Sequence, residues 1–340
     1  MSDAAQAAPL LDPLLVVGAG GGLGRAVMAH LRAAPSAPTT LITSRTPGAP
    51  LFVDLTAAPD TWRLPESPQA ATPVRAALLL AALTGVAACE SDPLLARRVN
   101  VDALLTLARR LAARGFFLVF PSTSQVFDGA SSHAAGLPRP NDPTSPQTAY
   151  GRHKAQAEAQ LLAEFPDHVA VLRITKVLDA DNWLIRRWVA AFLRGEEAGA
   201  FVDMCMAPVS ETLAAAALLG LAQARRPGVF QLSASRDMTY FEAARLGAET
   251  LGLDPSLARP EHYAERCAGR EIFAPEHTAL FVAPGSLPGL GPGIGPGIEP
   301  GLAPGGACPE PEAAVRRAFA LAGAALSRVK PGAAQRQERP

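Results

Sequence analysis

The 340-residue chain has few cysteines and no excess of charge of either sign. The cysteines stand singly at Cys89, Cys205, Cys267 and Cys308, without the C-x-x-C spacing of zinc or thiol redox sites. The six histidines form no H-E-x-x-H, so we expect no metal ion. Lysine plus arginine equals aspartate plus glutamate at 31 each, so no net field favours nucleic acid as a partner.

The sequence also shows no pattern that we would expect for a membrane span, a secretory signal or a hydrolase elbow. No G-x-S-x-G motif is present, which argues against a serine hydrolase. The first residues contain no basic segment followed by an apolar one, as a secretory signal would. The apolar run 207–224 is interrupted by Ser210, Glu211 and Thr212, which predicts a buried helix. We therefore expect a cytoplasmic protein without a membrane partner.

A glycine-rich turn follows the first apolar segment. Residues 14–18 predict a buried strand, and a helix is expected from about 22 to 33. Glycines in such a turn allow a tight bend and a close approach to a pyrophosphate, which then faces the helix N-terminus. A merely flexible turn would need no strand before it. The predicted dinucleotide contacts in this turn are Gly18, Gly21, Gly22, Leu23 and Gly24.

Tyr150 and Lys154 are four residues apart, so on a helix they share one face. A lysine ammonium and a nicotinamide cation near a phenol both favour the phenolate, which predicts a tyrosine pKa below its ordinary value of ~10. Such a tyrosine can protonate a carbonyl oxygen or deprotonate a hydroxyl. Alone, the spacing would indicate no more than a chance surface pair.

Two further features precede this pair in the chain. The hydrophobic segment 116–121 runs into the hydroxyl cluster 122–124. Ligands of open α/β sheets bind beyond the carboxyl ends of strands, where a hydroxyl can bond a carbonyl oxygen; by itself the cluster could simply end the strand. Asn100 lies inside an expected amphipathic helix, which is unfavourable by propensity but is also an ordinary polar position.

In this order, the features resemble the extended short-chain dehydrogenase/reductases, and among them the dTDP-4-dehydrorhamnose reductase group of sugar-nucleotide reductases. The glycine turn is similar to that group's G-x-x-G-Q-L-G, residues 122–129 to its S-T-D-Y-V-F-D-G, and residues 150–154 to its Y-G-x-x-K. The likeness covers roughly residues 12–283. It implies an NAD(P)H-dependent reductase of a keto-sugar nucleotide, with catalytic Thr123, Tyr150 and Lys154. Lys154 would also bind the nicotinamide ribose.

The choice between NADP and NAD rests on the end of the second strand. NAD enzymes place an acid there for the ribose hydroxyl, whereas Ser44 and Arg45 follow residues 39–43 in this chain. An arginine fork suits a 2′-phosphate, so we expect NADP, with NAD as the alternative. The resemblance adds four cofactor contacts: Asp54, Leu55, Ala81 and Ala82.

The substrate side departs from that group. Its substrate-side tryptophan aligns with Lys176, and its D-Q-x-G-x-P-T segment is replaced by residues 203–209. The catalytic residues are thus kept while the residues of the substrate pocket differ. We therefore expect a keto-sugar nucleotide as the class of substrate, without a prediction of the particular sugar. Predicted substrate contacts are Ser124, Asn182 and Trp183.

Two alternatives stay open. The same catalytic residues serve epimerases and dehydratases of sugar nucleotides, which hold NAD(P) tightly. The changed pocket also leaves room for a non-catalytic, NADP-binding regulatory subunit. A homodimer is a further option on which the sequence does not decide.

Alternating strands and helices predict an α/β fold: a Rossmann-type, doubly wound parallel sheet with a smaller C-terminal substrate-binding lobe. Strands are expected near 14–18, 39–43, 51–54, 76–82, 116–121, 168–174 and 228–232. Helices are expected near 22–33, 92–113, 147–165, 181–194, 210–224 and 240–252. The predicted parts are a disordered N-terminus (1–11), an NAD(P)-binding domain (12–175), a substrate lobe interleaved with the last Rossmann elements (176–283), a Pro/Gly-rich linker (284–309), a helix (310–327) and a disordered tail (328–340).

Overall fold

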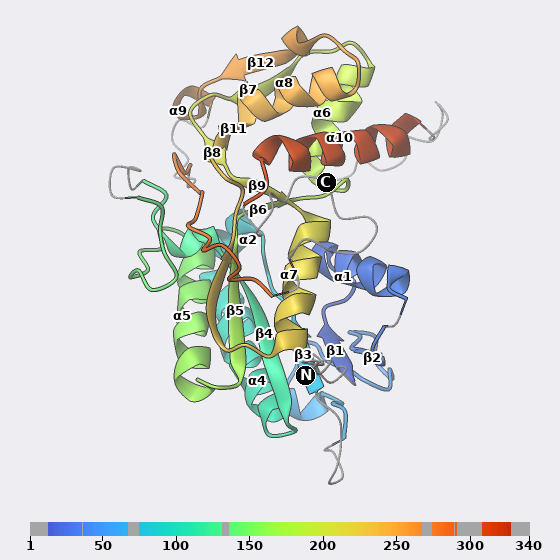
Figure 1. Ribbon diagram of the computed structural model, residues 1–340, viewed down its shortest axis with the longest axis vertical. Coiled ribbons are helices and arrows are strands. Elements are labelled where there is room, and N and C mark those ends of the chain that lie inside the picture. Colours follow the sequence, from blue (N-terminus) through green and yellow to red (C-terminus); the bar gives the residue numbers. More distant parts are fainter. Residues whose placement is uncertain are drawn as a thin grey trace, which may run out of the picture.

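A six-stranded parallel sheet forms the lower part of the molecule in the computed structural model, which describes residues 13–35, 37–66, 75–130, 136–266, 274–288, 290 and 308–327 (Figure 1). The strand order is β10-β5-β4-β3-β1-β2, and every neighbouring pair is parallel. The strands are β1 Leu14–Val17, β2 Thr40–Ile42, β3 Arg75–Leu79, β4 Phe116–Thr123, β5 Val169–Ile174 and β10 Gly228–Leu232. The predicted Rossmann-type fold is confirmed.

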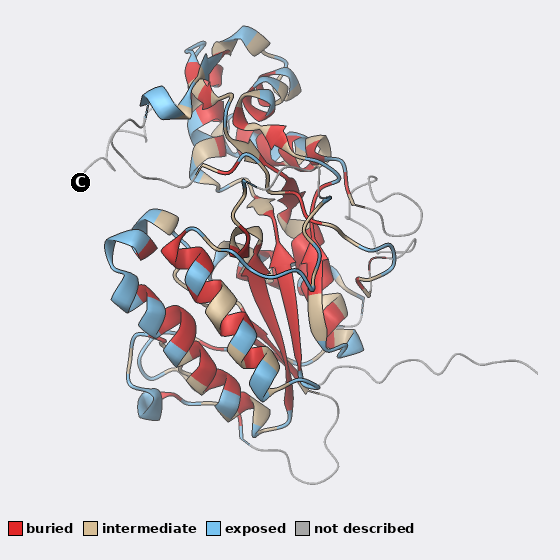
Figure 2. Cartoon of the chain, turned by 90° about the vertical axis from the view of Figure 1, so that its left-hand side faces the viewer, coloured by how far each residue is buried: buried red, intermediate tan, exposed pale blue. Residues whose placement is uncertain are grey.

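Helices cover both faces of this sheet. α1 (Gly22–Ala33) and α7 (Glu211–Ala224) pack on one face, and α4 (Leu104–Ala112) and α5 (Ala149–Glu164) pack on the other. Successive residues of β1 therefore belong to two different hydrophobic cores. Leu14 packs in the core that contains α1 and α7, and Leu15 packs in the core that contains α4. This explains why the central strands β1, β4 and β5 read as apolar runs and are buried along their whole length, whereas the edge strand β2 is not (Figure 2).

A smaller lobe lies above the carboxyl edge of the sheet in Figure 1. Its helices are α6 Trp183–Leu193, α8 Tyr240–Thr250 and α10 Pro311–Ser327. Its short strands pair as β7 Ala198–Phe201 with β12 Ala258–Glu261, β8 Cys205–Met206 with β11 Met238–Thr239, and β6 Lys176–Leu178 with β9 Pro208–Ser210. Trp188 of α6 stacks on Phe319 of α10, with 6.1 Å between ring centroids, at the centre of the lobe's core.

The chain passes between sheet and lobe more than once. After β6 and α6 in the lobe, α7 and β10 return to the sheet, and α8 then rejoins the lobe. The short single-turn elements are η1 Pro59–Thr61, η3 Ser124–Val126, η5 Pro255–Leu257 and α9 Tyr263–Arg266. The smaller lobe and the last elements of the sheet are thus interleaved.

Two predicted elements differ from the structure. The strand expected at 51–54 is absent, because only Phe52 pairs there, through single bridges to Ser44 and Arg63. The helix expected at 92–113 is divided into α3 (Pro93–Arg97), a π-helical segment (Arg98–Ala103) and α4, and a further helix, α2 (Val86–Ser91), precedes them. Asp92 separates α2 from α3, since its side chain accepts a hydrogen bond from Leu95 N at 2.9 Å.

Some predictions lie outside the described residues, namely the N-terminus 1–11, the tail 328–340 and most of the linker 284–309. The domain boundaries stay predictions. Across the described part of the chain, no helix is both long enough and apolar enough to cross a membrane.

Candidate active site

A cavity of about 640 Å³ opens at the carboxyl edge of the sheet, lined both by sheet-end loops and by the smaller lobe. It lies where β1 has β2 on one side and β3 on the other, the reversal point at which open α/β sheets bind ligands. Nine residues predicted from sequence line it: Gly21, Gly22, Leu23, Gly24, Ala82, Thr123, Ser124, Tyr150 and Lys154.

The glycine turn fits a dinucleotide. Gly18 has φ +92°, and a Cβ there would stand 2.6 Å from Ala81 N, so the turn packs against the end of β3. A Cβ on Gly24 would stand 2.3 Å from Gly18 O, so α1 packs closely on its own turn. By contrast, a Cβ on Gly20 would meet nothing within 4 Å. The first N–H groups of α1 have no intrahelical acceptors, so the open side of the turn presents donors and a positive dipole end to an anion.

Helix α5, which carries Tyr150, is held at its first turn by three contacts. Thr148 Oγ1 accepts a hydrogen bond from Gly151 N at 2.9 Å, and Glu90 Oε1 accepts one from Ala149 N at 2.6 Å. A Cβ on Gly151 would stand 2.2 Å from Gln125 O, so α5 lies directly against the segment that follows β4. These contacts bring Tyr150 into the cavity lined by Thr123.

Tyr150 and Lys154 are both buried, with 9% and 3% exposure. Burial, and then the Cys89 thiol, raise the pKa of Tyr150 well above its ordinary value. In the unliganded protein the pKa of Tyr150 therefore lies above its ordinary value, because desolvation is the main cause, and the lowering expected with a nicotinamide cation bound stays a prediction. The phenol is protonated at neutral pH, as it would be at its ordinary pKa.

The Lys154 side chain lies near the Tyr150 ring. Its Nζ donates a hydrogen bond to Pro121 O at 2.7 Å and lies 4.3 Å from the Phe120 ring centroid and 6.0 Å from that of Tyr150. Burial lowers the pKa of Lys154 to about 8. The Lys154 side chain is thus mostly protonated at neutral pH and begins to lose its charge near pH 8.

Hydroxyl groups end β4 inside the cavity. Thr123 Oγ1 accepts a hydrogen bond from Gln125 N at 3.2 Å, and Ser122 Oγ is buried without a partner among the described residues. Asn100, singled out by its place in a helix, bonds the Leu83 backbone twice, at 2.8 Å to N and 2.8 Å to O. It therefore orders the loop after β3.

Several predicted cofactor residues are not in the lining of this cavity: Gly18, Ser44, Arg45, Asp54, Leu55 and Ala81. Ser44 and Val53 are joined by a hydrogen bond from Val53 N to Ser44 O at 3.0 Å, which holds the turn after β2 next to Asp54. The Thr56 N–H, as the main cause, lowers the pKa of Asp54. Arg45 is exposed in this turn.

The two remaining predicted substrate residues, Asn182 and Trp183, differ in whether they line a cavity. Asn182 caps α6, where its Oδ1 accepts hydrogen bonds from Leu184 N at 3.1 Å and Ile185 N at 3.4 Å, and it lines neither cavity. Trp183 is 69% exposed and lines a second cavity of about 780 Å³ in the smaller lobe. The two cavities share Lys176, Met204 and Tyr240.

The second cavity combines aromatic rings with cations. Trp183 and Phe201 line it together with Arg187 and Arg266. Rings of this kind stack on planar bases, and guanidinium groups bind phosphates.

Sequence reasoning missed the lobe's share of the main cavity: Met204, Cys205, Met206, Tyr240, Pro275 and Thr278. These residues come from three distant segments that carry no motif. Lys176 and Asp179 also line this cavity, and the only signal for Lys176 was its replacement of an aromatic residue.

Comparison with known proteins agrees with this geometry. Residues 12–276 match the family described as RmlD substrate binding domain. A dTDP-4-dehydrorhamnose reductase of Mycobacterium tuberculosis is 34% identical over 54% of this chain and 62% of its own length. A dTDP-4-keto-6-deoxy-D-glucose reductase of Streptomyces niveus is 29% identical over 80% and 89%. The chain thus spans less than two thirds of the mycobacterial relative.

Two further matches concern the fold and the alternative of a non-catalytic subunit. A dTDP-4-dehydrorhamnose reductase of Bacillus anthracis, solved in complex with NADP, has the same fold, with a TM-score of 0.70, 18% identity, and coverage of 92% of this chain and 99% of that chain. The methionine adenosyltransferase 2 subunit beta of Danio rerio is 29% identical over 54% of this chain and 58% of its own length.

Proposed function

The chain belongs to the RmlD substrate binding domain family, and from that membership we propose that it is an NADPH-dependent reductase of a keto-sugar nucleotide. The observation that supports this most is the convergence of Thr123, Tyr150 and Lys154 in one cavity with the glycine turn. Sugar-nucleotide reductases among the relatives point the same way.

The cofactor would lie along the carboxyl edge of the sheet. Its pyrophosphate would face the first turn of α1, and the exposed Arg45 with Ser44 would receive the 2′-phosphate. Lys154 would bind the nicotinamide ribose. When bound, NADPH supplies the hydride.

Proton transfer would fall to Tyr150. The phenol holds its proton at neutral pH and can donate it to the substrate oxygen; because its pKa is raised by burial, the donation depends on a cation that stabilises the phenolate. Thr123 would hydrogen-bond and orient that oxygen. The Lys154 ammonium, mostly charged below pH about 8, would stabilise the phenolate left behind.

The substrate would extend into the second cavity. Its base and diphosphate suit the rings and guanidinium groups there, and its sugar would then lie at the junction formed by Lys176, Met204 and Tyr240. Ser124 and Trp183 remain the predicted contacts on the two sides of that junction.

Tyr150→Phe tests the proposal. The variant should bind NADPH as the wild type does, yet lose about 100-fold or more in turnover of a 4-keto sugar nucleotide, because it removes the proton donor. Tyr263→Phe is the matched control, since Tyr263 packs against Phe201 at the surface of the lobe and lines neither cavity. Unchanged turnover in Tyr150→Phe would remove the catalytic role.

The similarity to methionine adenosyltransferase 2 subunit beta favours one second candidate, a non-catalytic subunit that binds NADPH. Wild-type protein that binds NADPH but reduces none of a broad panel of keto-sugar nucleotides would support it. Interconversion of two sugar nucleotides without net NADPH consumption would instead indicate an epimerase.

A further inference from the structure

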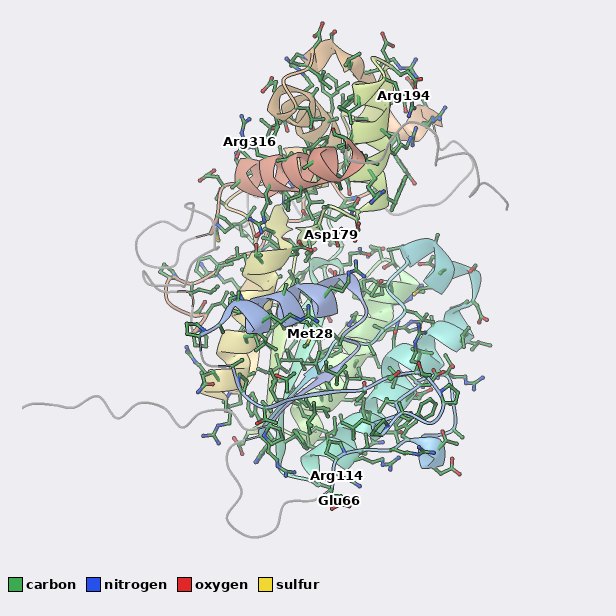
Figure 3. All side chains as sticks on the ribbon, turned by 90° about the vertical axis from the view of Figure 1, so that its right-hand side faces the viewer. Met28, Glu66, Arg114, Asp179, Arg194 and Arg316 are labelled. Carbon is green, nitrogen blue, oxygen red and sulfur yellow. The ribbon has the colours of Figure 1, made fainter. Side chains whose placement is uncertain are left out.

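A carboxylate stands at the opening of the glycine turn. Asp179 follows β6, and Figure 3 labels it between the smaller lobe and α1. Its Oδ2 lies 2.9 Å from the place where a Cβ on Gly22 would stand, and it lines the main cavity with that glycine. Gly22 is the first residue of α1, so the carboxylate is at the anion-binding end of that helix.

One oxygen of the Asp179 carboxylate receives no hydrogen bond from the part of the chain that the structure describes. Asp179 Oδ1 is buried and accepts no hydrogen bond from the described residues. Its charge acts on its neighbours: it is the second cause, after burial, of the raised pKa of Glu211, and it opposes the lowering of the pKa of Lys176 by burial.

The arginine of the turn is already engaged. Arg25 Nη2 pairs with Asp181 at 3.2 Å, and its Nη1 donates to Gly20 O at 3.0 Å. Asp181 also pairs with Arg186 at 3.2 Å. The segment that carries Asp179 therefore supplies a second carboxylate, which pairs with the arginine of the turn, whereas the charge that interacts with Asp179 is that of Lys176, on the lobe side of the cavity.

A cofactor pyrophosphate would need the same helix end. Two anions at one helix N-terminus repel each other strongly in a partly buried cavity, where screening is weak. A reductase must exchange spent for fresh cofactor in every cycle, whereas an enzyme that regenerates its cofactor in place gains from tight binding.

We propose that Asp179 competes with the cofactor's pyrophosphate for the N-terminus of α1 and so weakens dinucleotide binding enough for release in each cycle. The inference rests on the proposed reductase function and assigns Asp179 as a residue that determines cofactor affinity.

The test is the nearly isosteric Asp179→Asn, with NADPH binding measured by fluorescence titration and calorimetry. The variant should bind NADPH about tenfold more tightly than the wild type, since it loses one like charge. The gain should shrink as salt is raised. Binding of adenosine 2′-monophosphate, which has no pyrophosphate, should stay the same.

Asp254→Asn is the charge-matched control. Asp254 is exposed in the smaller lobe, where it caps η5, so the variant loses the same charge and should keep the wild-type affinity. Asp179→Ser is a second variant at the site and should also bind NADPH more tightly.

Equal or weaker NADPH binding by both Asp179 variants would overturn the inference, as would an equal gain for adenosine 2′-monophosphate. Both results leave the proposed function intact if the wild type binds NADPH and reduces substrate. Failure of every variant and of the wild type to bind NADPH would overturn the two together.

Discussion

At the scale of single residues, burial decides the electrostatics of the candidate site. Tyr150 and Lys154 are close in sequence and share one environment, yet desolvation moves their pKa values in opposite directions, because it disfavours an anion in one case and a cation in the other. Near pH 7, Tyr150 is a neutral phenol and Lys154 is mostly an ammonium. In this state the tyrosine has a proton to donate, and the lysine has a charge that stabilises the phenolate left behind.

The lowered pKa of Lys154 predicts how stability varies with pH. Between pH about 8 and 10 the unfolded chain keeps the lysine proton while the folded protein releases it, so Lys154 alone should raise the free energy of unfolding by roughly 2 kcal/mol. The raised pKa values of the Cys89, Cys205 and Cys308 thiols act in the opposite direction above pH about 9, so the contribution of Lys154 is the difference between the wild type and a variant without it. Tyr150 acts oppositely only above pH about 10, since its folded pKa is raised. Urea denaturation of unliganded protein at pH 7, 8, 9 and 10 measures this.

Lys154→Met provides the comparison for that series. Without the lysine, the rise relative to pH 7 should disappear while the rest of the pH profile is kept. A wild-type curve that runs parallel to that of the variant would contradict the assigned pKa.

At the scale of elements, the tyrosine helix depends on how it begins. Thr148 caps α5, Glu90 reaches it from α2, and the buried ion pair of Arg173 with Glu158, at 2.7 Å, joins it to β5. Helix α8 begins with a comparable cap, a capping box formed by Thr239, but lies in the lobe.

These two caps offer a matched pair of variants. Thr148→Ala and Thr239→Ala should each lower the free energy of unfolding by about 1 kcal/mol, because each leaves a helix N–H without its acceptor. Thr148→Ala should also lower kcat, since it loosens the turn that carries Tyr150. Thr239 directly precedes the substrate-side Tyr240, so Thr239→Ala should change KM while kcat stays near that of the wild type. Chemical denaturation and steady-state kinetics on both variants measure this; equal turnover would show that the cap does not position Tyr150.

At the scale of the whole molecule, the last helix completes the smaller lobe. Phe319 of α10 is fully buried, stacks on Trp188, and lies where a Cβ on Gly247 of α8 would clash with its ring at 2.1 Å. The linker prediction tied this helix to the body; the structure gives it a larger part, because it closes the core over which the second cavity is built.

Phe319→Ala should therefore lower the free energy of unfolding by about 3–5 kcal/mol through the cavity it leaves. Hydrogen exchange should rise in α6 and α8 before it rises in the sheet, since the sheet has separate cores. Leu321→Ala on the same helix is the control, as Leu321 is 43% exposed and should cost little. Uniform exchange throughout the molecule would mean that lobe and sheet unfold together.

The sequence alone determined those parts of the protein whose signals are local. Helix α1 begins and ends at the predicted residues, and the order of glycine turn, hydroxyl cluster and Tyr150 predicted the cavity that the sheet builds, because parallel strands bring their carboxyl ends to one edge. Local periodicity also predicted a strand at 51–54, where the structure has only single bridges, since pairing requires a partner that pattern cannot supply.

The tertiary structure alone decided the rest of the site. Met204, Tyr240 and Thr278 reach the cavity from separate segments of the interleaved lobe, and Asp179 meets Gly22 across more than 150 residues of chain. The raised pKa of Tyr150 was equally beyond the sequence, because burial depends on every element packed around a side chain, whereas a motif records only its neighbours along the chain.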